Sequence, residues 1–307
     1  MVSARLETLL KAGEFIVSAE LTPPRHYDTT QFVEAANLVA PFVDVVQIND
    51  NLLSQARLSN LVAAHLVQQV GLEPVIQFTL RHRNRIALQS DLLGFAALGV
   101  RNVMVLGGYP CTIGTDPDAK DASDLSSVEA IASITRLTRE GQFFNGDPID
   151  PAPDFFVGTI DFPCVNPADL DSSMARLAAK IEAGARYIQV QAIFDLAPMQ
   201  AWMAEVRARG LHERAHFIAA IFPFSGAKRL EFLQSVPGLS VPDDLLTRIR
   251  SADGEAESLR ITLELVEGIR QIDGIRGLHM RSIGAEDWVP RIVEAAGLRQ
   301  LLVSSAS

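Results

Sequence analysis

Short apolar runs alternate with longer amphipathic segments along the chain. The stretch EPVIQFTLRHRNRIALQSDLLGFAALGVRNVMVLGGYP (residues 73–110) opens with an alternating apolar run, continues with apolar residues at helical spacing, and closes with a second apolar run. This order predicts a strand, a helix and a strand, which is the parallel crossover unit. Polar residues gather where both strands end. In parallel α/β folds, ligands bind at that carboxyl-terminal edge.

The same alternation predicts eight strands in all. The expected strands cover residues 15–21, 43–49, 73–80, 102–107, 154–162, 186–194, 216–224 and 277–283. The expected helices cover residues 4–12, 31–42, 57–70, 84–98, 127–140, 168–183, 198–210, 227–235 and 286–296, with one or two more in 242–273.

No composition break or Ser/Gly linker divides the chain. We therefore predict a single-domain (β/α)8 TIM barrel over residues 1–307, with a short N-terminal helix and extra helices at about 242–274 between strands seven and eight. An open doubly wound sheet is the alternative. It is disfavoured because no GxGxxG motif follows the first strand.

Composition narrows the class of protein further. The 307 residues are 48% apolar, enough for a large core, and the net charge of -10 argues against a nucleic-acid surface. No run of apolar residues is long enough to span a membrane and the N-terminus lacks a signal-peptide core, so we expect a cytoplasmic protein. Cys111 and Cys164 lack metal-site spacing, so no metal is expected. The sequence does not determine the oligomeric state, and a homo-oligomer is one possibility.

Two strand ends carry candidate chemistry near the N-terminus. Glu20 ends the first strand just before two prolines. A carboxyl group at a barrel mouth is partly desolvated, which raises its pKa and suits a general acid. A solvated strand-end glutamate, or a partner for Arg25, is the alternative. Asn49, Asp50 and Asn51 end the second strand and either bind a heterocycle or ribityl chain or simply form a turn.

The third strand and the segment after it are also polar. Gln77 and Thr79 share one strand face, where inward polar groups need a ligand or water. Four further residues, Arg81, Arg83, Asn84 and Arg85, crowd the start of a helix, whose positive end is a poor place for arginines. They either bind an anion such as phosphate or pair with the acidic loop after Gly108.

Later strands add amides and aromatic rings. Gln189 and Gln191 share one face of strand six, near Lys180, and such amides suit the edge of a pterin or flavin ring. Phe222 and Phe224 either stack on an aromatic ligand or pack in a lid. The remaining conspicuous histidines are expected to be structural, namely His65, His212 and His216.

The combined motifs resemble the methylenetetrahydrofolate reductase family, in particular its compact bacterial branch. They are SAELTPP, VQINDN, the 73–106 stretch with its RxRN motif, AKIEAGARYIQVQAIFD and SVPD at residues 240–243. The resemblance covers nearly the whole chain. It implies a flavin-containing (β/α)8 barrel that reduces 5,10-methylenetetrahydrofolate to 5-methyltetrahydrofolate with NADH or NADPH, with FAD, or alternatively FMN, as cofactor.

The resemblance also implies roles for single residues. Glu20 matches the acid that helps open the folate ring to an iminium, which a reduced flavin then reduces; Gln191 matches a folate-binding glutamine. The implied cofactor-binding residues are Asn49, Gln77, Thr79, Arg81, Arg83, Asn84, Gly107, Gly108, Tyr109, Phe162 and Lys180. The implied substrate-binding residues are Gln191, Phe224 and Arg281.

Two positions depart from the family pattern. Tyr109 stands where relatives have an aspartate that contacts flavin and folate. Residues 283–285 (Ile-Gly-Ala) stand where relatives have an arginine that holds the folate glutamate. Arg281 is a candidate substitute for that arginine. These departures keep two alternatives open. One is a flavin-free folate-binding methyltransferase, and the other is a non-catalytic partner subunit of the same fold.

Overall fold

Eight parallel strands close into a barrel in the computed structural model, which describes residues 5–234, 239–250 and 254–299. Neighbours follow chain order, and β8 pairs with β1. The strands are β1 (Ile16–Leu21), β2 (Val45–Ile48), β3 (Glu73–Thr79), β4 (Asn102–Leu106), β5 (Phe156–Asp161), β6 (Tyr187–Val190), β7 (His216–Ile221) and β8 (Ile275–Met280). The prediction of a (β/α)8 barrel is confirmed.

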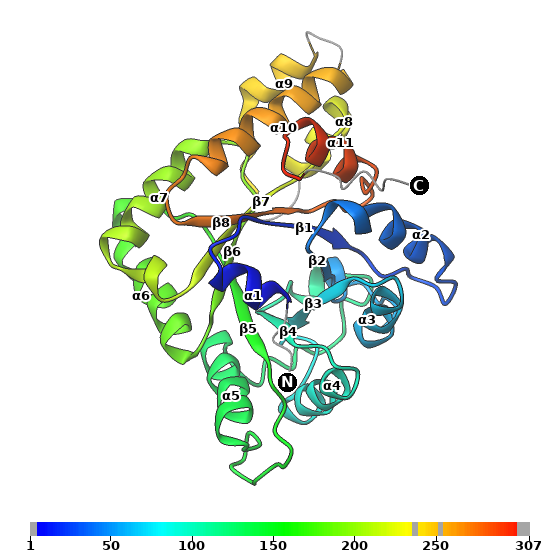
Figure 1. The fold of residues 1–307 in the computed structure, drawn as a ribbon, viewed down its shortest axis with the longest axis vertical. Coiled ribbons are helices and arrows are strands. Elements are labelled where there is room, and N and C mark those ends of the chain that lie inside the picture. The colour runs from blue at the N-terminus through cyan, green and yellow to red at the C-terminus, as the bar shows by residue number, and fades with distance from the viewer. Residues whose placement is uncertain (1–4, 235–238, 251–253, 300–307) are drawn as a thin grey trace, which may run out of the picture.

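Helices surround the barrel (Figure 1). They are α1 (Arg5–Lys11), α2 (Thr30–Val39), α3 (Asn60–Gln69), α4 (Arg85–Ala97), α5 (Ser127–Glu140), α6 (Pro167–Ala183), α7 (Leu196–Ala208), α8 (Gly226–Gln234), α9 (Asp243–Arg250), α10 (Gly254–Arg270) and α11 (Trp288–Ala295). Short 3-10 turns occur at Ala40–Phe42, Leu52–Ser54, Cys111–Ile113 and Leu211–Glu213. In the described part of the chain, no helix has the length and apolar character needed to cross a membrane.

The extra helices expected between strands seven and eight are α9 and α10. With α8 they form a group on one side of the barrel, next to β7 and β8 (Figure 1). Residues 251–253 of the expected segment lie outside the described residues, as do residue 4 of the first expected helix and residue 235 of the helix expected at 227–235.

The barrel interior is apolar at one end and polar at the other. At the apolar end, inward side chains such as Val45, Met104 and Tyr187 form a buried cluster with Leu6 and Leu10 of α1, which lies across the barrel (Figure 1). Packing is tight, because a Cβ on Gly158 would lie 2.2 Å from the Tyr187 ring. Polar side chains then occupy the end of the barrel at which the strands finish.

Three strands end three or four residues earlier than predicted. Strands β6 and β7 end at Val190 and Ile221, short of residues 194 and 224, and β8 ends at Met280, short of residue 283. The apolar residues beyond β6 and β7, such as Phe194 and Phe224, form a separate buried cluster with residues of α8, α9 and α10. An apolar loop buried under added helices has the same sequence pattern as a strand, so the pattern alone extends the strands too far.

Candidate active site

A cavity of about 440 Å³ lies at the carboxyl-terminal ends of the strands. Ten of the predicted site residues line it: Asn49, Gln77, Thr79, Gly107, Gly108, Tyr109, Phe162, Lys180, Gln191 and Arg281. Gln189, Asp50, Asn51 and His82 line it as well. Strand ends that are far apart in sequence therefore supply one wall, as the sequence predicted. Glu20, Arg81, Arg83, Asn84 and Phe224 are not part of that wall.

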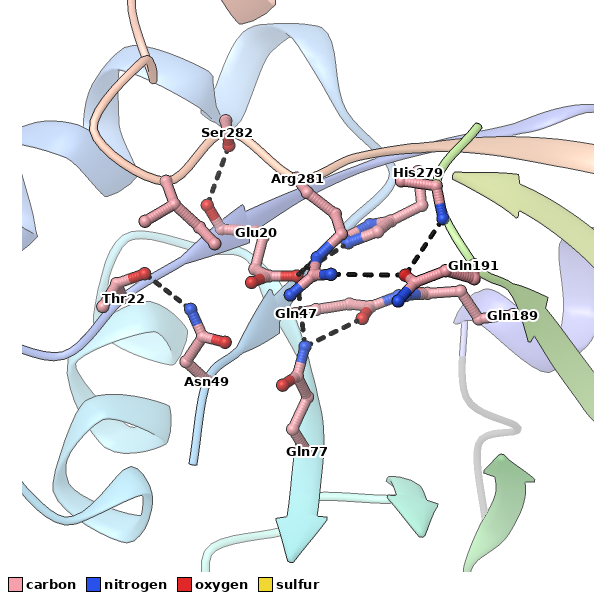
Figure 2. Close-up of polar contacts among 12 residues, drawn as sticks. Glu20, Thr22, Gln47, Asn49, Gln77, Gln189, Gln191, His279, Arg281 and Ser282 are labelled. Carbon is pink, nitrogen blue, oxygen red and sulfur yellow. Dashed lines mark hydrogen bonds and ion pairs between the residues drawn. The ribbon is translucent and has the colours of Figure 1, made fainter. Parts of the chain in front are cut away.

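Glu20 lies just beneath the cavity and is completely buried. Its Oε2 accepts hydrogen bonds from Gln77 Nε2 (3.2 Å), His279 Nε2 (3.2 Å) and Arg281 Nε (3.3 Å). Figure 2 shows these side chains converging from β1, β3 and the end of β8. The alternatives of a solvated glutamate and of a pair with Arg25 are wrong, because the carboxyl group is buried and its arginine partner is Arg281.

Amide side chains extend this polar layer across the barrel. Gln47, the register partner of Glu20 on β2, accepts a hydrogen bond from Gln77 (3.4 Å) and donates one to Gln189. Asn49 donates to the Thr22 hydroxyl at 2.5 Å. Within the described residues, Glu20 Oε1 is buried with no hydrogen-bond partner. An unpartnered acceptor in such a layer marks a position where a proton or a ligand donor fits.

His279 is a member of this layer that the sequence reasoning missed. Its Nδ1 lies 2.9 Å from the hydroxyl of Ser18, its register partner on β1. Burial lowers the pKa of His279, so the ring is neutral. The tautomer that satisfies both contacts donates from Nε2 to Glu20 and accepts from Ser18 at Nδ1. The signal was the alternation of His279 with Arg281 in LHMRS, which places both on the inner face.

The expectation that Glu20 has a raised pKa is wrong for this state of the protein. Burial raises the pKa, but the Arg281 charge and the hydrogen bond from His279 outweigh it, and the pKa of Glu20 is lowered from 4.5 to about 2. The local sequence around Glu20 indicates a partly desolvated carboxyl group, whereas its partners His279 and Arg281 come from the other end of the chain.

This lowered pKa predicts how stability changes with pH. Because the folded-state pKa lies below the unfolded value, the stabilisation is fully present above pH 4.5 and is lost as the pH falls towards about 2. We therefore expect the wild-type free energy of unfolding, relative to that of Glu20→Gln, to fall as the pH is lowered from about 5 to about 2. Urea unfolding at several pH values measures this difference, and a pH-independent difference would contradict it.

The arginines after β3 are bound to carboxylates. Arg81 pairs with Asp121 at 2.5 Å and Arg85 with Asp124 at 3.0 Å, so the acidic-loop alternative is confirmed for both. Asn84 caps α4, because its Oδ1 accepts from Ile86 N and Ala87 N. Asp124 also accepts from Arg85 N at 2.9 Å, which places a carboxylate of the chain itself at the helix end where phosphate was expected.

Arg83 belongs to a buried ion pair. Its Nη1 and Nη2 contact the two oxygens of Asp50 at 2.5 and 3.1 Å, and its Nε contacts Asp91 at 2.6 Å. Asp50 also accepts from Thr79 N at 2.8 Å. The Arg83 guanidinium therefore does not face the cavity. It supports Asp50 and Thr79, which form part of the cavity wall.

Lys180 and Phe162 lie on the cavity wall, whereas Phe224 is buried away from it. Lys180 lines the cavity, where its Nζ donates to Ile160 O (2.8 Å) and Asp161 Oδ2 (3.0 Å). Phe162 lines the wall and is 46% exposed, so it can contact a ligand. Phe224 is fully buried against Phe194, so the ligand-stacking expectation is wrong for it and the packing alternative is confirmed.

The loop after β2 holds the cavity rim in an unusual backbone conformation. Asn51, Leu53 and Ser54 have positive φ values of 47°, 54° and 52°. Ser54 Oγ donates to Tyr109 O at 2.7 Å, and a Cβ on Gly114 would lie 2.0 Å from Ser54 O. Strained residues persist only where the surroundings hold them, and they cluster at binding sites. The loop after β2 and the loop after β4 are therefore in direct contact at the cavity rim.

The chain is a closed (β/α)8 barrel with a buried carboxyl group beneath an amide-lined cavity. It therefore belongs to the class of barrel proteins that bind ligands at the carboxyl ends of the strands. The model of one such family, Methylenetetrahydrofolate reductase, matches residues 5–297. The chain belongs to the methylenetetrahydrofolate reductase family.

Individual relatives are distant. The chain is similar to "Methylenetetrahydrofolate reductase 1" of Schizosaccharomyces pombe, with 27% identity over 135 residues, which are 42% of this chain and 22% of that protein. It is also similar to "Probable methylenetetrahydrofolate reductase (NADPH)" of Caenorhabditis elegans, with 20% identity over 317 residues, covering 98% of this chain and 45% of that protein. The chain thus spans less than half the length of these relatives.

Solved structures share the fold. An uncharacterized protein from Clostridium thermocellum, which binds two copies of 5-methyl-5,6,7,8-tetrahydrofolic acid, has a TM-score of 0.65 and 15% identity, covering 96% of this chain and 100% of that one. A 2,3-dimethylmalate lyase has a TM-score of 0.52 and 14% identity, covering 97% and 84%. Identities this low show the common barrel alone.

Proposed function

We propose that this protein reduces 5,10-methylenetetrahydrofolate to 5-methyltetrahydrofolate with NADH or NADPH, through a bound flavin, FAD or alternatively FMN. The observation that carries the proposal is the buried Glu20 directly under an amide-lined cavity, in a chain of the methylenetetrahydrofolate reductase family. Folate ring opening needs a proton on the departing nitrogen, and in this proposal Glu20 provides it.

The cavity wall fits a planar heterocycle. Amide and hydroxyl groups of Asn49, Gln77, Thr79 and Gln189 present both donors and acceptors, as the edge of a flavin or pterin ring requires. A Cβ on Gly107 would meet nothing within 4 Å, so space remains beside this part of the wall. A flavin held there would supply hydride transfer between the nicotinamide and the folate.

The chain's own residues have three tasks in this proposal. The amides orient the folate so that the carbon to be reduced faces the hydride donor, and Gln191 on the wall is one of them. The apolar barrel beneath keeps water away from the acid. Glu20 holds the proton in the substrate complex and gives it to the departing nitrogen.

An absorbance spectrum of the pure protein tests the proposal. We expect the yellow spectrum of an oxidised flavin, bleaching when NADH or NADPH is added without oxygen, and recovery when 5,10-methylenetetrahydrofolate follows. A colourless protein that oxidises no NADH or NADPH with menadione as acceptor would overturn the flavin-dependent reaction.

One observation favours a second candidate, a flavin-free folate-binding methyltransferase. The arginines expected to bind the flavin phosphates are paired with carboxylates, and the basic side chains on the described cavity wall are His82, Lys180 and Arg281. Transfer of a methyl group from 5-methyltetrahydrofolate to a corrinoid or thiol acceptor by colourless protein would support this candidate.

A further inference from the structure

Arg281 covers the carboxyl group of Glu20. Its Nε lies 3.3 Å from Glu20 Oε2, its Nη1 lies 3.3 Å from Gln191 Oε1, and its guanidinium lies 4.6 Å from the centre of the Phe222 ring. Arg281 lines the cavity, whereas Glu20 does not. Figure 2 shows the Arg281 guanidinium beside the Glu20 carboxyl group, so Arg281 lies between this carboxyl group and part of the cavity.

Arg281 is also the positive partner that keeps Glu20 ionised. Among the described residues, the groups that face the Glu20 side chain are His279 and Arg281 from the end of β8, Gln77 from β3 and the neutral amide of Asn49 after β2. Gln77 is neutral, and burial lowers the pKa of His279 so that it is neutral as well. Without Arg281, a completely buried carboxylate would keep its desolvation cost and lose its counter-charge, and it would take up a proton instead.

Arg281 lies where the cavity meets a second, smaller groove. A small apolar groove of about 50 Å³ adjoins the cavity, and Arg281, Tyr109 and Leu52 line both. Its other walls are Leu53, Phe222, Arg229, Phe232, Leu233 and Ile283. The two contacts of Arg281 at 3.3 Å are long for charged hydrogen bonds, so a better-placed anion can replace them.

We propose that Arg281 is a positioning residue that responds to substrate: it holds Glu20 as a carboxylate in the free protein and turns to a carboxylate of the folate tail in the complex, where Glu20 becomes protonated. The inference rests on the proposed function, because the glutamate of folate supplies the competing carboxylate. It explains how an acid that is ionised in the free protein can donate a proton during the reaction.

Proton uptake on binding tests this inference without turnover. We would titrate the protein with 5-methyltetrahydrofolate by calorimetry in buffers of different ionisation enthalpy. Near pH 6, wild-type protein should take up about one proton per bound folate more than Glu20→Gln does. The difference removes any proton taken up by the ligand itself. 6-Methyltetrahydropterin, which has no carboxylate, should produce no such difference.

Two arginine variants refine the test. In Arg281→Gln, Glu20 is already protonated in the free protein, so the extra uptake should disappear. Arg57→Gln is the matched control, because Arg57 is half-buried, donates to Pro23 O at 3.0 Å and lies outside the cavity wall, and it should keep the wild-type uptake. If Arg281→Gln does not fold, wild type and Glu20→Gln still carry the comparison.

The outcomes separate the inference from the proposed function. Folate binding with equal proton uptake by wild type and Glu20→Gln would overturn the role of Arg281 and leave the proposed function intact. A protein that does not bind 5-methyltetrahydrofolate would overturn both. Greater uptake by wild type, lost in Arg281→Gln and retained in Arg57→Gln, would establish the switch.

Discussion

Glu20→Gln is expected to lower the turnover number for 5,10-methylenetetrahydrofolate reduction by about 10²- to 10⁴-fold, the usual contribution of a general acid. Glutamine has nearly the same shape and can still accept from Gln77, His279 and Arg281, but it cannot donate the proton needed for ring opening. Folate binding should survive, because Glu20 is not part of the cavity wall. Steady-state kinetics together with calorimetric binding of 5-methyltetrahydrofolate measure both effects.

Electron transfer to menadione is the control for this variant. It requires no proton on folate, so a flavin-containing Glu20→Gln protein should oxidise NADH or NADPH with menadione at the wild-type rate. A turnover number for folate reduction within about threefold of wild type would show that another group supplies the proton, since such a change is far below the effect of losing an acid.

Arg83→Met is expected to destabilise the protein by about 3–5 kcal/mol, because it leaves Asp50 as an unpaired buried charge. The Asp50 side chain is 3% exposed and its two oxygens face the Arg83 guanidinium. Asp50 also holds Thr79 N on the cavity wall, so folate binding should weaken too. Urea unfolding followed by circular dichroism gives the loss of stability.

Arg85→Met is the matched control for Arg83→Met. Arg85 lies on the same segment as Arg83 and also pairs with a carboxylate, that of Asp124, but the Arg85 side chain is 53% exposed. Exposed pairs contribute about 0–1 kcal/mol, so a small change is expected. The double variant Asp50→Asn, Arg83→Met should recover part of the lost stability. Equal effects for the two single arginine variants would contradict a special role for the buried pair.

The barrel was predictable from sequence because its signal is local. Each strand is a short apolar run, each outer helix has apolar residues at helical spacing, and the order repeats eight times. The position of Glu20 at the end of β1 followed from the same pattern, as did the amides that end β2, β3 and β6. Parallel strands place all such residues at one edge, so most of the cavity wall could be predicted.

The partners of those residues were decided by the tertiary structure. Glu20 and Arg281 are separated by 261 positions and meet only because β8 closes the barrel against β1. Likewise, the sequence does not determine which anions pair with Arg81 and Arg85. In the folded chain, the loop that carries Asp121 and Asp124 lies next to them. Local pattern determined where this protein places its polar groups. Barrel closure decided their charge state, because a buried group's ionisation depends on neighbours distant in sequence.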